Sequence, residues 1–585
     1  MDFKEDFAIF GDYLYFEKIG NVLCKKSEDL QKSFDFMEKQ KGFFVGYLSY
    51  EALSVRESET PLLEFLHFKK RKKISKNFES QSFFAPCILK ALDKDRFFRD
   101  FVSIKNALKK GNSYQVNYTQ ELNLKTHCDS FGVFKSLLSS QNTKYKGFFK
   151  SENIEILSFS PELFFKKKKN IVTLQPMKGT IKRDENKKQD KELKKTLKKD
   201  SKNRSENMMI VDLLRNDISK IAKIGSLRVK KLCKILSFKT LHQMVSTLKA
   251  DIGNSSLFDI FSAIYPCGSI TGAPKKSTME IIQSLENRER SVYCGAFGVI
   301  CKKEAIFNVP IRTLFKKQGD DFFSYGVGSG IVWESEAKSE FEELNLKTSF
   351  LFEATKEVKL LETMLMRGGK VFLLSLHLKR LLKTAKDLGY KQNVFLEKIH
   401  LEDSQKIYFK KDILELQPQN LLDFWEELDK EFIEKYKLKV EVKDCVLRLL
   451  LDKKGNIFVE QKPLLNIDSQ KIEIAKEKIE SQNDFLYIKS TYRKWYEKHK
   501  EGLFDSVFFN EKNELCEGAR SNIVLLKDGE YLTPCVQSGL LRGVFREFLL
   551  DSGMIKEQVL SLKDLKEAEK IYCINSVRGV VEVHL

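Results

Sequence analysis

The stretch YPCGSITGAPKKSTMEII, residues 265–282, constrains the fold of this chain more than any other. Its centre, residues 268–275, is punctuated by glycine and proline, which predicts a tight loop. Residues 277–285 then carry apolar side chains at helical spacing, which predicts a helix. Small residues before a helix start let an anionic group approach backbone N–H donors, and Lys275 would add a positive charge. A surface turn that caps a helix has the same pattern, so this stretch alone does not establish a ligand site.

The chain of 585 residues is too long for one ordinary hydrophobic core, so at least two domains are expected. The character of the sequence changes near residues 351–358, and we predict one domain at 1–350 and a smaller one at 351–585. In the first domain we expect strands at 43–48, 83–89, 113–119, 154–159, 171–174, 293–301, 305–314 and 322–332, and helices at 96–110, 205–221, 257–264 and 337–350. Long strands mixed with helices, without regular alternation, predict an α+β architecture.

The composition excludes several classes of protein. Hydrophobic residues make up 42% and charged residues 31% of the chain, which is typical of a soluble globular protein. No apolar run approaches the roughly 18–20 residues needed to span a bilayer, and no secretory signal is visible at the N-terminus. None of the eleven cysteines stands in a C-x-x-C pair, which argues against a zinc site or a disulfide framework. We therefore expect a cytoplasmic protein that does not bind membranes.

The net charge of +20 raises nucleic acid as a partner. Much of the excess lies at residues 166–169 and in the lysine-dense segment 182–204. These runs lack interleaved aromatic residues, and the second has the spacing of a solvated helix. We therefore expect no nucleic-acid partner. A basic scaffold that binds RNA remains the non-enzyme alternative, and a salt-dependent gel shift would reveal it.

Four further strings lie in order along the first half. They are Ser160-Pro161-Glu162, Lys178-Gly179-Thr180, Glu206-Asn207, and Glu343 four residues before Lys347. Together with residues 268–275, these strings resemble the signature of the chorismate-utilising enzymes, the family of anthranilate and aminodeoxychorismate synthases. The resemblance implies an N-terminal chorismate-binding domain with an α/β-sandwich fold.

Chorismate is a small dianion, so its site needs cations. Glu206 and Glu343 lie on separate predicted helices and match the family's glutamates that hold Mg²⁺. Taken singly, each would be interpreted as an exposed helix residue. Arg312 offers a planar fork for a carboxylate, and the glycines of YGVGSGIV (325–332) would let backbone N–H groups approach the substrate. The substrate-binding residues expected on this basis are Thr271, Gly272, Tyr293, Arg312, Gly328, Ser329 and Lys347.

Three positions indicate the reaction. Glu162 matches the family's general acid, which protonates the departing C4 hydroxyl, and burial would supply the raised pKa that this role needs. Gln115 stands where water-adding members carry a lysine base, which implies a nitrogen nucleophile instead. Lys178 stands where anthranilate synthases carry alanine, whereas in aminodeoxychorismate synthases a lysine there attacks chorismate C2 and ammonia then opens the adduct at C4. Such an amine, held near Mg²⁺ and away from water, would be neutral and nucleophilic.

Two features of the first half depart from what relatives carry. Many relatives have a histidine two residues before the Val245-Ser246 pair, whereas this chain has Gln243 there with His242 beside it, and which of the two takes the role is left open. No amidotransferase signature appears in the sequence. The resemblance therefore implies that ammonia comes from a separate glutamine amidotransferase subunit.

A second ordered set of strings fills the other half. It consists of Leu361-Glu-Thr363, His377-Leu-Lys-Arg380-Leu381 on an amphipathic helix, a strand-like run at 485–489, and the strings at 505–510, 517–522, 533–534 and 539–543. The set resembles the class IV pyridoxal-phosphate enzymes, which implies an α+β domain of PLP fold type IV. Lys489 would form the Schiff base with pyridoxal 5′-phosphate and shuttle the Cα proton, and Glu517 would pair with the pyridine nitrogen. The phosphate would be held by Arg380 and the backbone amides at Gly543 and Val544, although Phe545 replaces a small hydroxyl residue of some relatives.

Class IV enzymes include transaminases and a lyase, so the second half alone leaves the reaction open. The product expected of the first half, 4-amino-4-deoxychorismate, is the substrate of the lyase, which releases pyruvate and 4-aminobenzoate. Arg578, in the string NSVRG (575–579), could bind a substrate carboxylate. The resemblance thus implies a bifunctional enzyme that makes 4-aminobenzoate for folate synthesis. The alternative is an anthranilate synthase component I fused to a class IV aminotransferase, and the oligomeric state, including a dimer through the second half, is left open.

Overall fold

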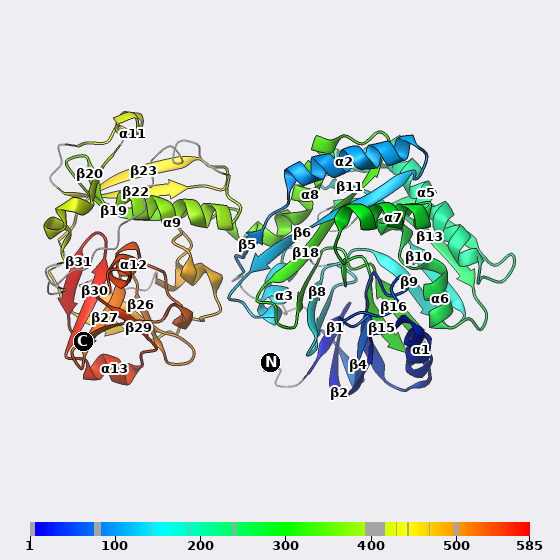
Figure 1. Cartoon of the computed structure of the whole chain (residues 1–585), viewed down its shortest axis with the longest axis horizontal. Coiled ribbons are helices and arrows are strands. Elements are labelled where there is room, and N and C mark those ends of the chain that lie inside the picture. Colours follow the sequence, from blue (N-terminus) through cyan, green and yellow to red (C-terminus); the bar gives the residue numbers. More distant parts are fainter. Residues whose placement is uncertain are drawn as a thin grey trace. The chain divides into compact units, whose positions relative to one another are not determined.

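The computed structural model describes residues 6–585 except 75–83, 142, 185, 238–240, 303, 392–412, 414–415, 429, 441–443, 467 and 497–501 (Figure 1). The chain forms two compact units. Unit 1 comprises Met1–Ser80, Leu89–Lys125 and Phe134–Phe350, and unit 2 comprises Gln81–Ile88, Thr126–Val133 and Leu351–Leu585. Two short segments of the first half of the sequence therefore belong to unit 2.

The described strands β1 to β18, which include the short strand β5 (Cys87–Lys90), belong to one connected sheet. At one end, β13 (Leu241–Asp251) pairs with both β11 (Met177–Lys182) and β12 (Arg228–Ser237). From β13 the pairing runs through β10 (Ile171–Gln175), β9 (Leu163–Lys168), β16 (Glu304–Asn308), β15 (Ala296–Cys301), β3 (Phe43–Leu48), β4 (Leu63–Lys73), β2 (Tyr13–Cys24), β1 (Ala8–Phe10), β7 (Gly147–Lys150), β8 (Ile154–Ser158), β17 (Thr313–Lys317), β18 (Phe323–Val332), β6 (Gln115–Lys125) and β14 (Gly272–Ala273).

Helices cover this sheet. Figure 1 shows α2 (Lys94–Lys109), α7 (Lys275–Glu286) and α8 (Ala337–Thr348) lying along β6 and β18. The helices α5 (Ser201–Ser219) and α6 (Leu257–Ile264) pack against each other, and α5 also contacts β11 and β13. α6 begins at a capping box in which Ser256 and Asp259 satisfy each other's backbone N–H groups, and it coincides with the helix predicted at 257–264. The helices α1 (Leu30–Lys39) and α3 (Ser130–Leu138) complete the described α-helices of the first half, apart from the basic helix described next.

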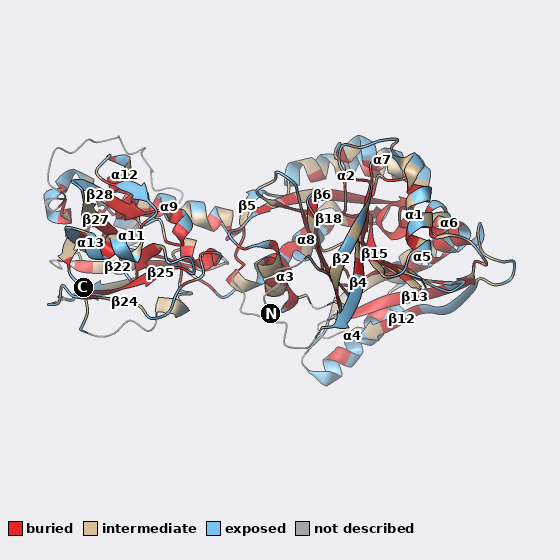
Figure 2. Cartoon of the chain, turned by 90° about the horizontal axis from the view of Figure 1, so that it is seen from below, coloured by how far each residue is buried: buried red, intermediate tan, exposed pale blue. Residues whose placement is uncertain are grey.

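The lysine-dense segment forms helix α4 (Lys187–Lys199), as its spacing predicts. Its start is capped by the Asn186 side chain, which accepts hydrogen bonds from the backbone N–H groups of Lys188 and Gln189. Figure 2 shows mainly exposed surface along α4, and only Asp190 and Leu197 are buried. The basic run is therefore a solvated helix face.

The strand predicted at 305–314 is two strands, β16 and β17. The break lies at residues 309–312, where Pro310 has no N–H to donate and Arg312 takes a left-handed backbone conformation with φ of +51°. Phe159 N nevertheless donates to Arg312 O at 3.0 Å, so the turn is fixed against the end of β8. Arg312 therefore lies in the turn between β16 and β17, outside both strands.

The loop predicted at 268–275 is compact and buried. After a short 3₁₀ turn (Gly268–Ile270), β14 pairs with β6 at Gln115 and Val116, and α7 begins at Lys275. Gly272 has φ of +148°, and a Cβ atom there would lie 1.9 Å from the carbonyl oxygen of Gln115. Only glycine therefore allows this loop to approach β6.

Unit 2 is built on three small sheets. The first has the order β21-β20-β19-β22-β23, the second β24-β25-β26 and the third β29-β28-β27-β30-β31. Their bounds are β19 (Leu360–Arg367), β20 (Lys370–Phe372), β21 (Trp425–Glu427), β22 (Cys445–Leu451), β23 (Ile457–Pro463), β24 (Ile472–Ile474), β25 (Asp505–Phe509), β26 (Leu515–Gly518), β27 (Asn522–Lys527), β28 (Glu530–Pro534), β29 (Lys556–Gln558), β30 (Lys570–Asn575) and β31 (Gly579–Val583). This mixture of helices and sheets confirms the α+β expectation.

Helices of unit 2 pack on these sheets. α9 (Leu374–Asp387) contacts β19 and α12 (Val544–Asp551), and α12 also contacts β30. The short helix α13 (Leu562–Glu567) contacts β27, and α11 (Lys430–Lys435) is a further short helix of this unit. The strand-like run predicted at 485–489 is wrong, because residues 484–487 form a 3₁₀ turn. Its cause is Asn483, whose side chain accepts a hydrogen bond from Phe485 N and so starts a turn instead of a strand.

The two segments that the first half of the sequence contributes to unit 2 converge on Asp484. This carboxylate is buried and accepts hydrogen bonds from Ala85 N (2.8 Å), Thr126 Oγ1 (2.7 Å) and His127 N (2.7 Å). The His127 ring stacks on Tyr487 with a centroid distance of 3.5 Å. The buried Asp484 carboxylate of unit 2 is therefore satisfied by donors at residues 85, 126 and 127, which lie more than 350 positions earlier in the sequence.

None of the helices in the described part of the chain is long and apolar enough to cross a membrane. The eleven cysteines all lie in that part, and all of them are free thiols.

Candidate active sites

The first candidate site lies where the two ends of the unit 1 sheet come together. A Cβ atom on Gly330 of β18 would lie 2.3 Å from Gln115 Nε2 on β6 and 3.5 Å from Lys178 Nζ on β11. Gln115 is fully buried, and neither its amide oxygen nor its amide nitrogen has a hydrogen-bond partner among the described residues. A buried amide with no partner is costly, which points to a polar ligand beside Lys178.

Glu162 lies between β8 and β9 and is 4% exposed. Burial raises its pKa to about 7, against the opposing effects of the Ser269 hydroxyl and the Lys178 ammonium. Its Oε1 atom has no hydrogen-bond partner in the described part of the chain. The side chain can therefore carry a proton near neutral pH and has an oxygen free to deliver it.

The predicted metal ligands come from two helices, Glu206 from α5 and Glu343 from α8. Burial raises the pKa of Glu206, and the negative charges of Glu340 and Glu343 raise it further. The positive charges of Lys178 and Lys202 act in the opposite direction. Partial burial opposes ionisation of Glu343, but the Lys347 ammonium, 2.7 Å away, outweighs it and lowers the pKa of Glu343. Two carboxylates that feel each other's charge suit Mg²⁺, which usually takes one or two protein carboxylates and keeps several waters. No group of three or more His, Cys, Asp or Glu side chains that could hold a metal ion occurs among the residues described.

The predicted substrate-binding residues come from separate elements of unit 1. Lys347 Nζ donates to Gly328 O on β18 at 2.7 Å, and the buried Ser329 hydroxyl next to it has no partner among the described residues. Thr271 is fully buried in the 268–275 loop and donates its hydroxyl to Cys267 O at 3.1 Å, so that this hydroxyl holds the loop. Tyr293 is buried against Gly326 of β18, where a Cβ atom would lie 2.3 Å from its ring.

Arg312 Nη1 donates to Gln141 Oε1 at 2.8 Å. Burial lowers the pKa of its guanidinium group, and no carboxylate lies within ion-pair distance of it in the described part of the chain. An arginine that is held by a neutral amide keeps its positive charge available for an anion.

His242 does not join the predicted site residues in any contact described. Its ring is buried between Ser237 Oγ, 2.9 Å from Nδ1, and Asp190 Oδ1, 3.0 Å from Nε2. Asp190 in turn pairs with Arg183 at 2.9 Å. The polar contacts of His242 therefore tie β13 to helix α4, while Gln243 follows it on the strand and points to the other face.

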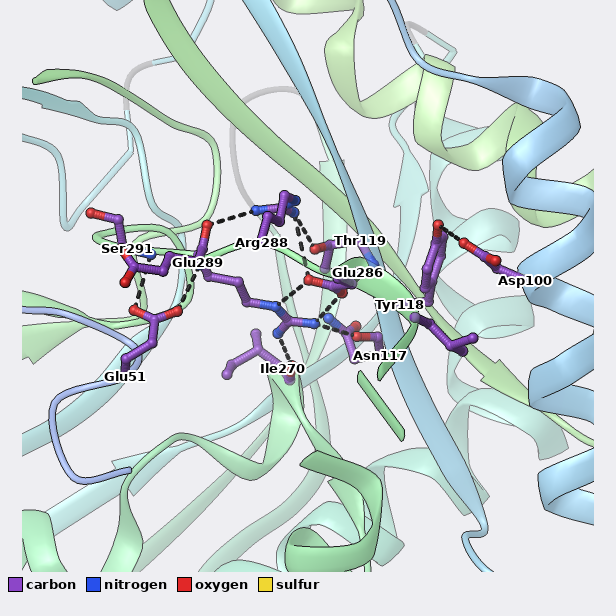
Figure 3. Close-up of polar contacts among 12 residues, drawn as sticks. Glu51, Asp100, Asn117, Tyr118, Thr119, Ile270, Glu286, Arg288, Glu289 and Ser291 are labelled. Atoms are coloured by element: carbon purple, nitrogen blue, oxygen red, sulfur yellow. Dashed lines mark hydrogen bonds and ion pairs between the residues drawn. The ribbon is translucent and has the colours of Figure 1, made fainter. Parts of the chain in front are cut away.

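A buried ion pair that sequence patterns did not indicate lies behind the 268–275 loop. Arg290 is 1% exposed, and its guanidinium group donates to both carboxylate oxygens of Glu286, at 2.6 and 2.9 Å. It also donates to Ile270 O in the loop (2.9 Å) and to Asn117 O on β6 (2.8 Å). Figure 3 shows these groups converging from the loop, β6 and the end of α7.

Neighbouring residues complete this network. Glu286 also accepts from Thr119 N at 2.8 Å, and Arg288 donates to the Thr119 hydroxyl at 2.6 Å. Glu51 accepts from the backbone N–H groups of Arg290 and Ser291 (Figure 3), and burial raises its pKa to about 7. The four-residue spacing of Glu286 and Arg290 in the sequence is the spacing of an ion pair within a helix. However, α7 ends at Glu286, so Arg290 lies outside the helix and the pair is formed by the turn that follows it. The network fixes the loop that carries Thr271 and Gly272.

The second candidate site lies in unit 2 around Lys489 and Glu517. Burial lowers the pKa of Lys489 to about 7, and the positive charges of Arg493 and Arg380 act in the same direction. Burial raises the pKa of Glu517 to about 7. Tyr496 donates its hydroxyl to Glu517 Oε1, and Asn522 Nδ2 lies 3.4 Å from Oε2. A lysine that is readily neutral and a carboxyl held by a hydroxyl fit the needs of a pyridoxal-type cofactor.

Arg380 is held by a buried carboxylate. Glu362 on β19 accepts from Arg380 Nε at 2.8 Å and Nη2 at 2.5 Å, and from His377 Nδ1 at 2.6 Å. These charges outweigh burial and lower the pKa of Glu362 to about 2. His377 Nε2 continues the network to Ser576 Oγ at 2.9 Å. Sequence patterns singled out the string LET (361–363) but assigned no role to Glu362.

A candidate anion site adjoins Arg380. Its Nη1 donates to Arg542 O at 2.9 Å, directly before Gly543 and Val544, where α12 begins. No side chain caps this helix start, so its first N–H groups are available to a phosphate. A Cβ atom on Gly543 would lie 2.0 Å from Asn522 Oδ1, so a side chain there would displace the Asn522 amide. The residues present therefore fit the phosphate end of the cofactor as well as its ring.

Arg578 follows β30 in the turn at 575–578. Its Nη2 donates to Leu465 O at 2.6 Å, and its backbone N–H donates to Asn575 Oδ1 at 2.8 Å. Ser576 of the same turn contacts His377, so the turn adjoins the Arg380 network.

Two family profiles match this chain. The profile of the chorismate binding enzymes matches residues 17–353, and that of amino-transferase class IV matches residues 359–585. The probable chloroplastic aminodeoxychorismate synthase of Oryza sativa subsp. japonica is 36% identical over 260 residues, which are 43% of this chain and 29% of that protein. Aminodeoxychorismate synthase component 1 of Klebsiella aerogenes is 35% identical over 255 residues, which are 43% of this chain and 56% of that protein. The chain thus spans less than two thirds of the length of these relatives.

A solved structure supports the fold of unit 1. Anthranilate synthase component I from Streptococcus pneumoniae TIGR4 superposes with a TM-score of 0.51 at 21% identity, covering 60% of this chain and 93% of that one. This likeness concerns the fold alone. With the family profile over residues 17–353, it means that a chorismate-binding domain is followed by a class IV aminotransferase-like domain, and that the chain belongs to the chorismate binding enzymes.

Proposed function

We propose that this chain is a bifunctional enzyme of 4-aminobenzoate synthesis for folate. Unit 1 would convert chorismate and ammonia to 4-amino-4-deoxychorismate, and unit 2 would eliminate pyruvate from that product to leave 4-aminobenzoate. The observation that carries the proposal is the grouping of Lys178 with a buried, partly protonated Glu162 and the unpartnered amide of Gln115. The relatives named aminodeoxychorismate synthase support it.

In unit 1, Lys178 Nζ bonds to chorismate C2, the ring double bonds shift, and the C4 hydroxyl leaves as water with the proton that Glu162 supplies. Ammonia then bonds to C4, the double bonds shift back, and the bond to Lys178 breaks, which regenerates its amine. Glu206 and Glu343 would hold Mg²⁺, which would offset the negative charge of the substrate there. Arg312 and the backbone at Gly328 would bind the remaining carboxylate.

Ammonia for this reaction would come from a separate glutamine amidotransferase subunit. The support is the name "component 1" that the Klebsiella relative carries. Free ammonium at high concentration should replace that subunit, since Lys178 and Glu162 act on chorismate without it.

In unit 2, pyridoxal 5′-phosphate would supply an electron sink for the carbon that carries the amino group. Arg380 and the N–H groups at Gly543 and Val544 would hold its phosphate, and Glu517 its ring nitrogen. Lys489, whose pKa is lowered to about 7, removes the proton from that carbon and returns one to the departing enolpyruvyl group, which leaves as pyruvate. The ring that remains is aromatic 4-aminobenzoate.

The second candidate function is an anthranilate synthase component I joined to a class IV aminotransferase. Lys178 argues against it, because anthranilate synthases carry alanine at that position. Free cysteines at all eleven positions support a reducing compartment such as the cytoplasm for either function.

The test is product identification by mass spectrometry from chorismate, ammonium and Mg²⁺, with the wild type and Lys178→Ala. We expect the wild type to form 4-aminobenzoate and pyruvate. Lys178→Ala should lose nearly all consumption of chorismate, yet still convert supplied aminodeoxychorismate. Anthranilate as the main product of the wild type, or full activity of the variant, would contradict the proposal.

A further inference from the structure

The side chain of Asn575 contacts the backbone of two arginines of unit 2, Arg520 and Arg578. Asn575 Oδ1 accepts from Arg578 N at 2.8 Å, and Asn575 Nδ2 lies 3.5 Å from Arg520 O, within hydrogen-bond distance. Arg520 N in turn lies 3.1 Å from the buried Asp505 Oδ2. These contacts fix the backbone of both arginines beside each other.

Among the described residues, the guanidinium groups of Arg520 and Arg578 lack a counter-charge. In the part of the chain that the structure describes, no carboxylate lies within ion-pair distance of Arg520 or Arg578, and the guanidinium of Arg578 donates only to the neutral Leu465 O. Burial lowers the pKa of Arg578, and the positive charge of Arg520 lowers it further. Arg520 is exposed and Arg578 is partly buried, so both guanidinium groups are open to an anionic ligand, which would offset the repulsion between the two charges.

The pair adjoins the candidate cofactor site on two sides. Arg520 follows Glu517 by three residues, on the turn that leads from β26 to β27. Arg578 shares its turn with Ser576, whose hydroxyl contacts His377 and, through Glu362, the Arg380 network. The backbones of both arginines therefore adjoin elements that carry the groups proposed to hold the ring and the phosphate.

We propose that Arg520 and Arg578 form a site for a substrate with two carboxylates, and that Arg520 is a specificity-determining residue of unit 2. The inference rests on the proposed function of unit 2 and deepens it. 4-Amino-4-deoxychorismate carries two carboxylates, whereas 4-aminobenzoate and the common amino acids with apolar side chains carry one. Two arginine forks match a dicarboxylate, because each can bind one carboxylate through two hydrogen bonds.

The test uses the full chain with Lys178→Ala as the background, so that unit 1 consumes no chorismate. Aminodeoxychorismate is supplied, and pyruvate release is measured. Arg520→Gln should raise KM about 10- to 100-fold while kcat changes little, because a charge-assisted contact to bound substrate is lost. Arg520→Lys should recover part of this loss. The salt dependence of kcat/KM should also weaken in Arg520→Gln, which a merely structural role would not produce.

Two inhibitors separate the carboxylates. Chorismate is a dicarboxylate that lacks the reacting amine, so in this background it should compete with the substrate, and its inhibition constant should rise about tenfold or more in Arg520→Gln. Inhibition by 4-aminobenzoate, a monocarboxylate, should change much less. Equal weakening of both inhibitors, or an unchanged KM, would overturn the proposal.

Two controls keep the outcomes distinct. Arg448→Gln removes another arginine of unit 2, one that pairs with Glu460 at 3.1 Å, and should leave KM unchanged. Borohydride reduction followed by peptide mapping should show the same cofactor loading in every variant, and lost loading in both Arg520→Gln and Arg520→Lys would assign Arg520 to folding and overturn the inference. If the background protein releases no pyruvate at all, the proposed function of unit 2 fails instead.

Discussion

Glu162 illustrates how burial alone sets the protonation state of one side chain. Its environment raises the pKa to about 7, while the nearby Lys178 ammonium acts in the opposite direction. Desolvation therefore outweighs an attractive charge at this position. The result is a carboxyl group that still holds a proton at pH values where an exposed glutamate has lost it.

Chorismate consumption should depend on this proton. The protonated fraction of Glu162 falls as the pH rises through about 7, so we expect the rate to fall across the same range. Glu162→Gln should lower the rate by about 10²- to 10⁴-fold and remove this limb of the pH profile. Stopped assays of chorismate loss over a pH series check both points, with conversion of supplied aminodeoxychorismate by unit 2 as the unaffected control. A variant with the wild-type rate and profile would show that another group is the acid.

Single residues of the site were partly predictable. Lys178, Glu206 and Glu343 could be singled out because they stand in strings that resemble a family signature. Arg290, Asp484 and Glu362 could not be singled out, because their roles depend on contacts with residues far away in the sequence. In the sequence alone, a charged residue that will be buried cannot be told from one that will be exposed.

At the scale of elements, local signals predicted what local interactions determine. The helix at 257–264 was predicted without error, because a capping box and an apolar face lie within its own residues. The interruption of 305–314 was missed, since Arg312 takes a left-handed conformation that its side chain does not favour. The 3₁₀ turn before Lys489 was missed for a similar reason, because the apolar run 485–488 has the composition of a strand while Asn483 forces a turn.

The 268–275 loop offers a test at this scale. In Gly272→Ala the new Cβ would lie 1.9 Å from Gln115 O, in a backbone conformation that disfavours side chains, so unit 1 should lose about 3 kcal/mol of stability or more. Urea unfolding, followed by separate probes for the two units, measures the shift. Gly319→Ala is the matched control, because Gly319 also has a positive φ but no atom within 4 Å of the new Cβ, and it should cost about 1 kcal/mol. Equal losses in both variants would contradict the close approach.

For the whole molecule, the proposed catalytic residues of the synthase all precede Leu351, and those of the lyase all follow it. Each set includes an acid or base with a shifted pKa and its own binding groups. Apart from the ammonia source, neither reaction needs a side chain from the other set. The two activities should therefore be separable by mutation.

Mixing two variants tests this separation. Lys489→Ala should consume chorismate and accumulate aminodeoxychorismate. Lys178→Ala should not consume chorismate but should convert aminodeoxychorismate to 4-aminobenzoate. Their mixture should regain 4-aminobenzoate production after a lag that lengthens on dilution, because the intermediate must diffuse between molecules. Chromatography of the two separate variants and of their mixture over time measures the lag. Loss of chorismate consumption in Lys489→Ala would contradict independent sites.

The hydrogen bonds to Asp484 have a consequence for how the chain emerges from the ribosome. Ala85, Thr126 and His127 are synthesised long before the carboxylate that they bind, so these donors must wait for residue 484. A nascent chain that ends at residue 350 should therefore leave 126–133 open to a protease, whereas the finished chain should protect that segment. If the gene were cut at residue 351, the separate second half would lack the donors that bind the buried Asp484 carboxylate. The two halves have separate chemistry, but we therefore expect that they must be synthesised as one polypeptide.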